Sequence, residues 1–359
     1  MLIRILPALV ANAKSEMKSL PKNGLTVIDA FCGAGVGAVG SEMAGFSTIY
    51  AFDNNHHAVR NFNKNISNVA VCLDARDIDY DSIPDADVIT GGFPCKPWST
   101  AGSKLGIKDE KNGDLGELFV DLILHKKPKA FLMENVAGIV NKRNIKFFNM
   151  LVERMSDLYD IKWKLVNCAD YGIPQKRERV FVIGIRKEIG SSYVFPQTSS
   201  KKVSIKEALA GLPEIPDGLN NHEYHQSFAI RKDETPYISK IPIGGNWKCL
   251  PENEARAFMK GAFNNGGGRT GFLRVIDPNL PAKTIMSTPM GKSTAQILRI
   301  SDGSSRRFTV RESLRLQTVP DFWCFDKETP ISVQYERCSG IPSLMSYQLM
   351  IEIGNALNV

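Results

Sequence analysis

A cysteine between two prolines is the residue of this sequence whose surroundings best suit nucleophilic chemistry. Cys95 lies in the segment GGFPCKPWS (91–99), where each proline biases the residue before it toward extended backbone. A rigid loop of this kind would hold the thiol exposed, and nearby basic residues would increase the fraction of thiolate, the reactive form. The alternative is a small buried core residue, which is the usual role of a single cysteine.

An acid and a pair of arginines could serve the same chemistry. Glu134 follows the apolar run KAFLM (129–133), so it is either a positioned acid at the end of a buried strand or a solvated loop residue. The segment QKRERV (175–180) puts Arg177 and Arg179 on one face of a strand, because side chains alternate along a strand. Taken alone, that segment could also be a charged edge.

A glycine-rich turn and two acids indicate a bound nucleoside. The segment DAFCGAGVG (29–37) ends a predicted strand, where glycines allow a tight turn and a close approach to a cofactor. The spacing is not that of the dinucleotide fingerprint, and the glycines alone fit a plain turn equally well. Asp53 ends the next predicted strand and could bind a ribose diol, and Asp74 follows the third and could accept from an adenine amino group. Together these residues favour an adenosine-type cofactor.

The elements that must position these residues alternate between strand and helix patterns. Strands are predicted at 25–31, up to 53, and at 69–73, 86–91, 129–133 and 179–185; helices are predicted near 37–44, 55–65, 115–126 and 145–158. This alternation predicts an α/β fold with a doubly wound sheet. Residues 190–310 are rich in Gly, Pro, Asn and Ser and read as a smaller, loop-rich second domain. Helical patterns return at 311–318 and 343–353. We therefore expect one domain from 1–189, completed by 311–359, and a second at 190–310.

Composition and charge set the broad class. The 359 residues are 43% hydrophobic and 23% charged, which is ordinary for a globular protein, and no apolar run is long enough to span a membrane. The net charge is +7, and residues 190–310 contain 16 of the 45 Lys and Arg residues against 10 of the 38 Asp and Glu residues. This local excess predicts either a polyanion partner or a solvated basic surface.

Cysteine usage favours a reducing compartment. The seven cysteines include no C-x-x-C pair, so neither a disulfide framework nor a cysteine zinc site is expected. The one H-x-x-H, formed by His222 and His225, is interpreted as a loop, and no metal is expected. Residues 1–13 loosely imitate a secretory leader, but the chemistry of Cys95 requires a reduced thiol, so we expect a cytoplasmic protein.

The motifs, in their order and spacing, resemble the DNA cytosine-5 methyltransferase family. The similar blocks are DAFCGAG, GGFPCKPWS, ENV, QKRERV, RESLRLQ and IGNAL, covering about 29–186 and 306–357. The resemblance implies a Rossmann-like S-adenosylmethionine-dependent methyltransferase sheet with a smaller target recognition domain. It implies transfer of a methyl group to carbon 5 of a cytosine flipped out of a specific double-stranded DNA sequence, through a covalent cysteine adduct.

The resemblance also implies roles for individual residues. Cys95 would attack carbon 6 of the cytosine, Glu134 would protonate ring nitrogen 3, and Arg179, with Arg177 beside it, would bind the carbonyl. Thr284 would contact the DNA backbone next to the flipped base. The S-adenosylmethionine pocket would comprise Phe31, Gly33, Gly35, Asp53, Asp74, Leu118 and Asn355.

Sequence readout is expected from two loops of the second domain. The stretches 243–249 and 260–274 are candidate recognition loops, and their candidate contacts are Trp247, Lys248, Arg269 and Arg274. Each of these four residues could instead bind a phosphate or pack within its loop. Double-stranded DNA is the expected partner, and we expect a monomer without an obligatory protein partner.

Some positions depart from the family pattern, and other functions compete. Val36 replaces a glycine, Asn54 an aromatic residue, Lys96 a glutamine and Glu352 a glutamine. The alternatives are a tRNA cytosine-5 methyltransferase, a catalytically silent nucleic-acid-binding module and, by fold analogy only, a nicotinamide oxidoreductase. A tRNA enzyme would have a shorter second domain, and a silent module would have lost Cys95 or Glu134.

Overall fold

A seven-stranded sheet organises the first domain. The computed structural model describes Met17 and residues 20–94, 114–214, 224–226, 229–264, 271–288, 291 and 293–358. The sheet has the order β3-β2-β1-β4-β5-β8-β6. Its strands are β1 (Thr26–Ala30), β2 (Ser47–Asp53), β3 (Ala70–Cys72), β4 (Val88–Gly91), β5 (Ala130–Val136), β6 (Tyr159–Asn167) and β8 (Glu178–Arg186). The first five strands run parallel, and β8 is antiparallel to both of its neighbours. The predicted doubly wound α/β sheet is confirmed.

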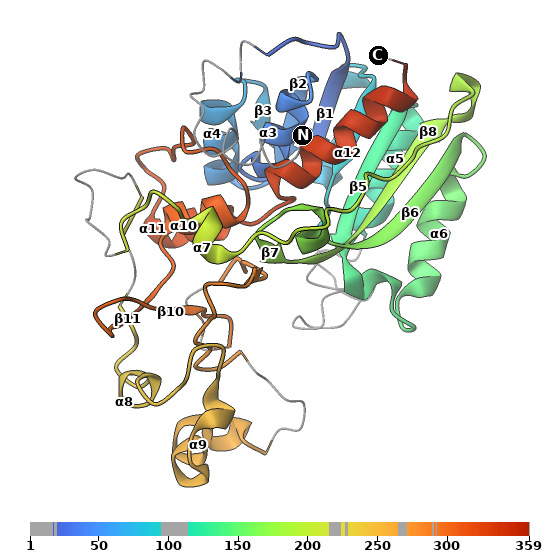
Figure 1. Cartoon of the computed structure of the whole chain (residues 1–359). Helices are drawn as coiled ribbons and strands as arrows, with labels where there is room; N and C mark the ends of the chain where they lie inside the picture. Colours follow the sequence, from blue (N-terminus) through green and yellow to red (C-terminus); the bar gives the residue numbers. More distant parts are fainter. Residues whose placement is uncertain are drawn as a thin grey trace.

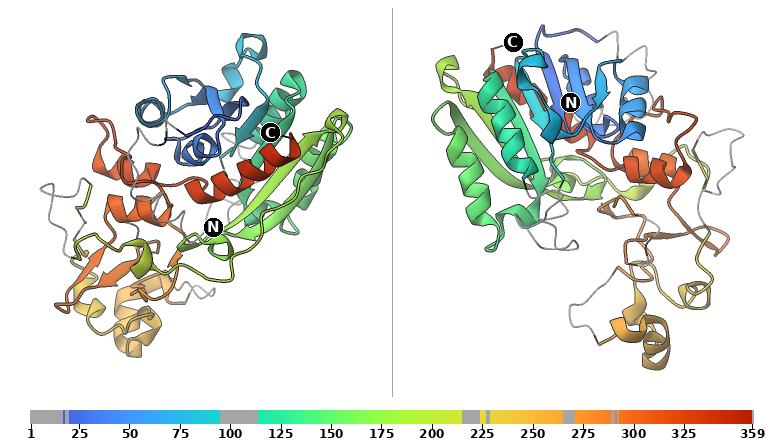
Figure 2. Two further views of the ribbon diagram at one scale, coloured as in Figure 1. Left: turned by 45° about the horizontal axis from the view of Figure 1, so that its top comes forward. Right: turned by 180° about the vertical axis from the view of Figure 1, so that it is seen from behind.

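Helices cover both faces of the sheet. On one face lie α5 (Leu115–Lys126) and α6 (Ile145–Met155), seen from behind in Figure 2. On the other face lie α3 (Val36–Met43), α4 (His56–Asn65) and α12 (Ser343–Ala356), with α12 crossing the sheet in Figure 1. The carboxyl-terminal helix α12 therefore packs against the sheet.

Helices α3 and α12 approach each other closely at a glycine. A Cβ atom on Gly40 would lie only 2.1 Å from the backbone oxygen of Ser343 and 2.6 Å from the backbone nitrogen of Tyr347. The hydroxyl of Ser343 donates a 2.7 Å hydrogen bond to the backbone oxygen of Val36, at the start of α3. This contact places the residues just before α12 against the first turn of α3.

The second domain extends away from the sheet, below it in Figure 1, and contains short elements around a small core. Its elements are α8 (Thr235–Ile238), α9 (Glu252–Met259), β9 (Ala282–Lys283), β10 (Ile297–Arg299) and β11 (Ser305–Arg307). The core is formed by apolar residues from α8, α9 and the loops between 238 and 297. One parallel pair, between β7 (Gln175–Lys176) and β9, joins the second domain to the first.

The chain after β8 stays on the first domain for some distance. Tyr193 is fully buried in the core beneath α12, and the backbone nitrogen of Ser199 donates to the backbone oxygen of Asp170 at 2.7 Å. The helix α7 (Ile205–Ala208) then packs with Leu316 of α10 (Val310–Leu316). Tyr193 and Ser199 therefore contact the part of the chain that contains the sheet.

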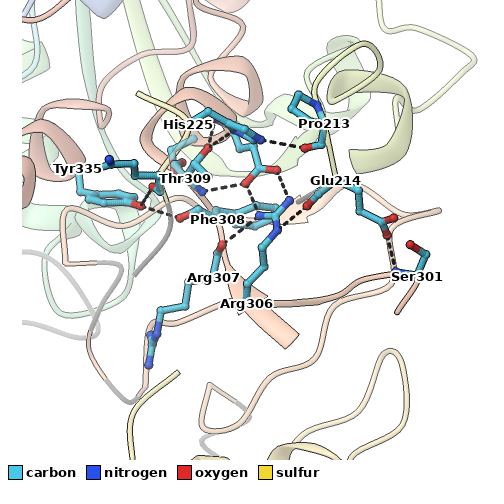
Figure 3. Close-up of polar contacts among 12 residues, drawn as sticks. Pro213, Glu214, His225, Ser301, Arg306, Arg307, Phe308, Thr309 and Tyr335 are labelled. Atoms are coloured by element: carbon cyan, nitrogen blue, oxygen red, sulfur yellow. Dashed lines mark hydrogen bonds and ion pairs between the residues drawn. The ribbon is translucent and has the colours of Figure 1, made fainter. Parts of the chain in front are cut away.

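A polar network links the two segments of the chain that pass between the domains, as Figure 3 shows. The backbone oxygen of Glu214 accepts from Arg306 at 2.8 Å, and its carboxylate accepts from the backbone nitrogen of Ser301 at 2.8 Å. The buried His225 lies 2.8 Å from the backbone oxygen of Pro213 and 3.1 Å from the hydroxyl of Thr309. His225 therefore serves packing between segments, as expected for a loop residue.

Two features of other classes of protein are absent from the described residues. None of the described helices has the length and apolar character needed to cross a membrane. Within the described ranges, no group of three His, Cys, Asp or Glu side chains is arranged to hold a metal ion.

Candidate active site

A cleft opens where the strand order reverses, at the carboxyl ends of β1 and β4. Two cavities of about 470 Å³ and about 300 Å³ share the wall residues Phe31, Gly92 and Pro94, so they form one continuous cleft. The larger cavity lies beside the ends of β2 and β3. The smaller cavity extends toward β5, β8 and the segment before α12. Ligands of doubly wound sheets bind at this topological switch point.

The turn after β1 is built from residues with positive φ angles. Phe31 has φ 54°, Gly33 has φ 54° and Gly35 has φ 90°. The left-handed region is costly for a bulky residue such as Phe31, and such strain concentrates at functional sites. Gly35 precedes α3 and has no room for a side chain, since a Cβ there would lie 3.0 Å from the ring of Phe62. Gly33 lines the smaller cavity, whereas Gly35 shapes the turn.

Two carboxylates face the larger cavity. Asp53 accepts hydrogen bonds from the backbone nitrogens of Gly33 at 3.0 Å and Asn55 at 2.9 Å, and burial raises its pKa. Each carboxylate oxygen has a second lone pair, so Asp53 can still accept from a diol. Asp74 accepts from the backbone nitrogen of Arg76 at 3.0 Å, which lowers its pKa and keeps it charged.

The apolar wall of the larger cavity is suited to an aromatic base. Phe31 packs against Phe52 and Phe119, with ring centroids 5.5 Å and 6.3 Å away. Leu73 and Leu115 complete the wall. This combination of an apolar slot and two carboxylates fits the adenosine half of S-adenosylmethionine.

Asp29 is a buried acid in the smaller cavity that was absent from the predicted site. Burial raises its pKa to about 7, even though the hydroxyl of Thr90 donates a 2.9 Å hydrogen bond to it. The charge of Asp53 adds to the upward shift. The position of Asp29 at the start of the glycine-rich motif was the signal that could have identified it.

Glu134 and Arg179 form an ion pair at the other end of the cleft. In the antiparallel β5–β8 pair, Glu134 lies opposite Phe181 and Val136 lies opposite Arg179, so Glu134 and Arg179 are diagonal neighbours on one face. Their Oε1 and Nε atoms are 2.8 Å apart, and each side chain is 13% exposed. The second carboxylate oxygen, Oε2, faces Gly92, where an added Cβ would lie 2.9 Å away.

The end of β5 also contacts the backbone just before Cys95, the predicted nucleophile. The side-chain amide of Asn135 donates a 3.2 Å hydrogen bond to the backbone oxygen of the buried Phe93. Pro94, which follows, lines both cavities. Cys95 is the next residue in the sequence and lies outside the described residues.

Arg177, the other predicted arginine, is more deeply buried than Arg179. Arg177 is 4% exposed, lines the smaller cavity and has its Nη1 3.5 Å from the backbone oxygen of Ile285 in the second domain. The fully buried Gln175 donates to the backbone oxygen of Leu316 at 3.1 Å and accepts from the backbone nitrogen of Ile285 at 2.9 Å. The segment 175–179 therefore connects the cleft to the second domain, at Ile285, and to the carboxyl-terminal part of the chain, at Leu316.

Two predicted cofactor residues do not line the cleft. The prediction for Asn355 is wrong, because Asn355 is exposed at the far end of α12 and its side chain donates to Glu352 at 3.0 Å. The carboxyl-terminal wall of the cleft consists instead of Arg337, Ser339, Gly340, Ile341 and Ser346. Leu118 packs on the first domain's core, and it is Leu115, one turn earlier on α5, that lines the larger cavity.

The predicted DNA contacts lie in and beside the second domain. Thr284 is half-buried and donates a 2.9 Å hydrogen bond to the backbone oxygen of Lys176. Trp247 packs edge-on against Phe263 with centroids 5.6 Å apart, whereas Lys248 is exposed. Arg274 lines a separate cavity at the domain junction, and Arg269 lies outside the described residues.

This architecture defines a class of protein. A parallel sheet with a single antiparallel strand beside β5, and a cleft at its switch point suited to adenosine, is an α/β enzyme fold for a nucleoside cofactor. Comparison with known proteins narrows the class. A sequence model of the C-5 cytosine-specific DNA methylase family matches residues 25–348, and the chain belongs to that family.

Individual relatives agree with this assignment. The chain is 32% identical to the type II methyltransferase M.Eco47II of Escherichia coli over 91% of this chain and 78% of that protein. It is 35% identical to the type II methyltransferase M.PspPI of Psychrobacter sp. over 86% and 74% of the respective chains. The fold is similar to that of the methyltransferase EhMeth of Entamoeba histolytica, with a TM-score of 0.67 and 16% identity over 93% and 99% of the respective chains.

The chain is therefore a DNA cytosine-5 methyltransferase, and its methyl donor is S-adenosylmethionine. A DNA substrate follows from the family. The tRNA methyltransferase, the silent binding module and the nicotinamide oxidoreductase are not favoured by these relationships.

Proposed function

We propose that the chain methylates a cytosine flipped out of double-stranded DNA of a specific sequence, through a covalent bond to Cys95. The observation that carries the proposal is the Glu134–Arg179 pair, which faces the cleft with its second carboxylate oxygen toward Gly92. Pro94, the last described residue before Cys95 in the sequence, lines the cleft. A nucleophile and an acid would then meet on one target base.

The proposed steps use the chain's own residues. The Cys95 thiolate forms a bond to carbon 6 while Glu134 delivers a proton to nitrogen 3, so that the electron pair is available at carbon 5. When bound, S-adenosylmethionine supplies the methyl group that carbon 5 accepts. A base then removes the carbon 5 proton, the ring double bond re-forms, and the Cys95 sulfur leaves with its electron pair. The proton on nitrogen 3 returns to Glu134.

The remaining predicted residues position the reactants. Asp53 is proposed to hold the ribose, Asp74 the adenine amino group, and Phe31 the adenosine face, with Gly33 and Gly35 shaping the turn. Arg179 holds Glu134 and is proposed to reach the cytosine carbonyl, with Arg177 beside it. Stacking in a duplex covers the face of carbon 6, so the cytosine must leave the helix before Cys95 can attack.

DNA recognition is assigned to the second domain. We propose that Thr284 contacts the backbone beside the flipped base and that Lys248, Trp247, Arg269 and Arg274 belong to the recognition surface. The type II relatives support a role in sequence-specific modification within a restriction–modification system. A reduced nucleophilic thiol supports a cytoplasmic location, and nothing in the proposed chemistry requires more than a monomer.

The proposal is tested with labelled S-adenosylmethionine and duplex DNA. We expect the unaltered protein to transfer label, and Cys95→Ser to lose transfer by several orders of magnitude. Cys72→Ser, which removes an exposed thiol, is the matched control and should retain full transfer. Equal transfer by Cys95→Ser would overturn the nucleophile.

Two further measurements separate the alternatives. DNA containing 5-fluorocytosine at the target should trap a covalent adduct at Cys95, because fluorine cannot leave as a proton does. Bisulfite sequencing of a methylated random pool should reveal one short recognition sequence. Label entering tRNA but not DNA, or methylation without sequence preference, would contradict the proposed substrate.

A further inference from the structure

Two lysines lie directly opposite each other where the domains meet. Lys176 of β7 pairs with Lys283 of β9 in the parallel register. Like charges in this arrangement are destabilising. Both lysines line a cavity of about 280 Å³, and Arg274 contributes a third cation to its wall. Burial and the charges of Lys176 and Arg274 lower the pKa of Lys283.

The cavity carries further donors and one acid. Asn246 lines it, and because its side-chain oxygen accepts from the backbone nitrogen of Lys248 at 3.1 Å, its amide NH2 group can face a ligand. Asp277 also lines the cavity, but its carboxylate accepts from the backbone nitrogen and the side chain of Asn279, at 2.9 Å and 3.1 Å. Among the described residues, no carboxylate forms an ion pair with the amino group of Lys176 or Lys283. In the described part of its wall, the cavity therefore carries three cationic side chains and one carboxylate.

We propose that this cavity is a binding site for a backbone phosphate of the DNA substrate. A phosphate bound between Lys176 and Lys283 would convert their repulsion into two charge-assisted contacts. Because one lysine comes from the first domain and the other from the second, the bound phosphate would link the domains next to the cleft. The inference rests on the DNA methylation proposed above.

The test removes one charge at a time. Lys283→Gln and Lys176→Gln should each weaken binding to duplexes of any sequence and reduce the slope of log affinity against log salt by about 1. Lys283→Gln should also keep or raise the melting temperature of the free protein, since a repulsive contact is removed. Lys146→Gln, at an exposed position on α6, is the matched control and should change neither quantity.

Three results would overturn the phosphate site. They are an unchanged salt slope in both variants, a loss of DNA affinity accompanied by a fall in melting temperature, or binding of inorganic phosphate with no effect on DNA affinity. Methylation by the unaltered protein, measured in parallel, tests the proposed function separately. A protein that methylates DNA while both variants keep the original slope refutes only the phosphate site.

A second, independent observation concerns an arginine in the cofactor cleft. Arg337 ends the helix α11 (Ile331–Arg337), lines the smaller cavity and is 17% exposed. Its Nε is buried and has no hydrogen-bond partner among the described residues, and its one ion pair is a 3.5 Å contact with its exposed neighbour Glu336. Such an unsatisfied buried donor is costly and points to an absent acceptor.

The surroundings of Arg337 identify the part of the cofactor it faces. Burial raises the pKa of Asp53, the proposed ribose ligand, and the nearby charge of Arg337 is one of the interactions that oppose this rise. The segment after Arg337 covers the first turn of α3. A Cβ atom added to Gly340 in this segment would lie 3.4 Å from the side chain of Val36. A methionine part bound in the smaller cavity would lie beside this turn and beside the segment after Arg337, since both line that cavity.

We infer that Arg337 binds the carboxylate of the methionine part of S-adenosylmethionine. The other two cations among the described residues that line the cavity are engaged elsewhere, Arg179 by Glu134 and Arg177 beside Ile285. A guanidinium binds a carboxylate through two parallel hydrogen bonds, which would satisfy the buried Nε.

The test compares two ligands that share the adenosine part. S-adenosylhomocysteine carries the carboxylate, whereas 5′-deoxy-5′-methylthioadenosine lacks the whole amino acid end. By calorimetry, Arg337→Gln should weaken S-adenosylhomocysteine binding by about tenfold or more. Binding of methylthioadenosine should stay within about twofold of its original value. Arg60→Gln is the control. It removes an exposed arginine that pairs with Glu328, just before α11, and should affect neither ligand.

The comparison distinguishes a carboxylate contact from an indirect role. An equal loss for both ligands would mean that Arg337 acts through Asp53 or the fold, and unchanged binding of both would mean that it makes no contact. Either result overturns the assignment. DNA methylation by the unaltered protein does not enter this measurement, so failure of the proposed function would be seen separately.

Discussion

The carboxyl group of Asp29 is held inside the cleft under conditions that disfavour its charge. Burial raises its pKa from an ordinary value of 3.8 to about 7, so the folded protein binds this proton more tightly than the unfolded chain between those pH values. Stability should therefore fall as pH rises from about 4 to about 7, and remain lower above that range. Asp29→Asn removes the titration and preserves an acceptor for the hydroxyl of Thr90.

We expect Asp29→Asn to gain stability over the unaltered protein as pH rises. The gain should approach ~4 kcal/mol above pH 7 as an upper bound, and vanish near pH 4. Urea unfolding at several pH values measures it. Asp157→Asn, at an exposed position, should show no such pH-dependent gain. A constant difference between Asp29→Asn and the unaltered protein across pH would contradict the argument.

Gly92 controls the position of the proposed acid. A Cβ at this residue would lie 2.9 Å from Oε2 of Glu134, a contact that only movement of the carboxylate can relieve. Displacing a catalytic group by about 1 Å can cost roughly a hundredfold in rate. Reaching an ordinary contact from 2.9 Å needs a shift of about 0.5 Å, so Gly92→Ala should lower kcat by roughly tenfold and change the melting temperature little. Gly261→Ala, where an added Cβ meets open space, should leave kcat intact, and a similar kcat for both variants would refute this role.

Among the elements, the contact between α3 and α12 depends on one glycine. A Cβ on Gly40 would meet backbone atoms of Ser343 and Tyr347, which cannot rotate away as a side chain can. We expect Gly40→Ala to lower the free energy of unfolding by about 3 kcal/mol or more, despite the better helix propensity of alanine. Gly37→Ala is the control in the same helix, since its Cβ would make an ordinary 3.6 Å contact with Ile341. Chemical denaturation that ranks the two variants equally would contradict the close packing.

The elements differ in how far the sequence alone could identify them. Strands β1, β4, β5 and β8 are buried apolar runs, and their predicted positions are confirmed. The strand β6 was not predicted, because it is a sheet edge on which charged Lys162 and Lys164 alternate with the exposed Trp163 and Leu165. The alternation of apolar and polar residues over 161–165 is itself a strand signal, but burial does not follow it, because Trp163 and Leu165 are each 45% exposed.

The carboxyl-terminal wall of the cleft shows a second limit. The helix α12 was predicted, but the motif IGNAL near its end led to the wrong prediction that Asn355 binds the cofactor. At a helix rise of about 1.5 Å per residue, Asn355 lies roughly 18 Å from the start of α12. The cleft residues Ser339, Gly340 and Ile341 precede the helix and meet α3 only through folding. The glycine and proline of CSGIPS (338–343) could have indicated a loop there, but its neighbour across the cleft is about 300 residues away in the sequence.

For the whole molecule, one buried side chain joins the three parts that must act together. Gln175 lies between the sheet domain, the second domain at Ile285 and the carboxyl-terminal segment at Leu316, with both ends of its amide hydrogen-bonded. Gln175→Met keeps the approximate volume but leaves a backbone nitrogen and a backbone oxygen without partners. Since each buried unsatisfied group costs about 1–3 kcal/mol, unfolding should become easier by roughly 2 kcal/mol or more.

The effect should reach DNA binding before it reaches cofactor binding, because the lost contacts orient the second domain and not the floor of the cleft. We expect Gln175→Met to weaken DNA binding several-fold, to speed proteolytic cleavage between residues 229 and 300, and to leave S-adenosylhomocysteine affinity within about twofold. Gln226→Met, at an exposed position, is the control. If Gln175→Met instead lost cofactor affinity in parallel with DNA affinity, the two domains would unfold as one unit, and Gln175 would stabilise the whole chain without a specific role at the junction.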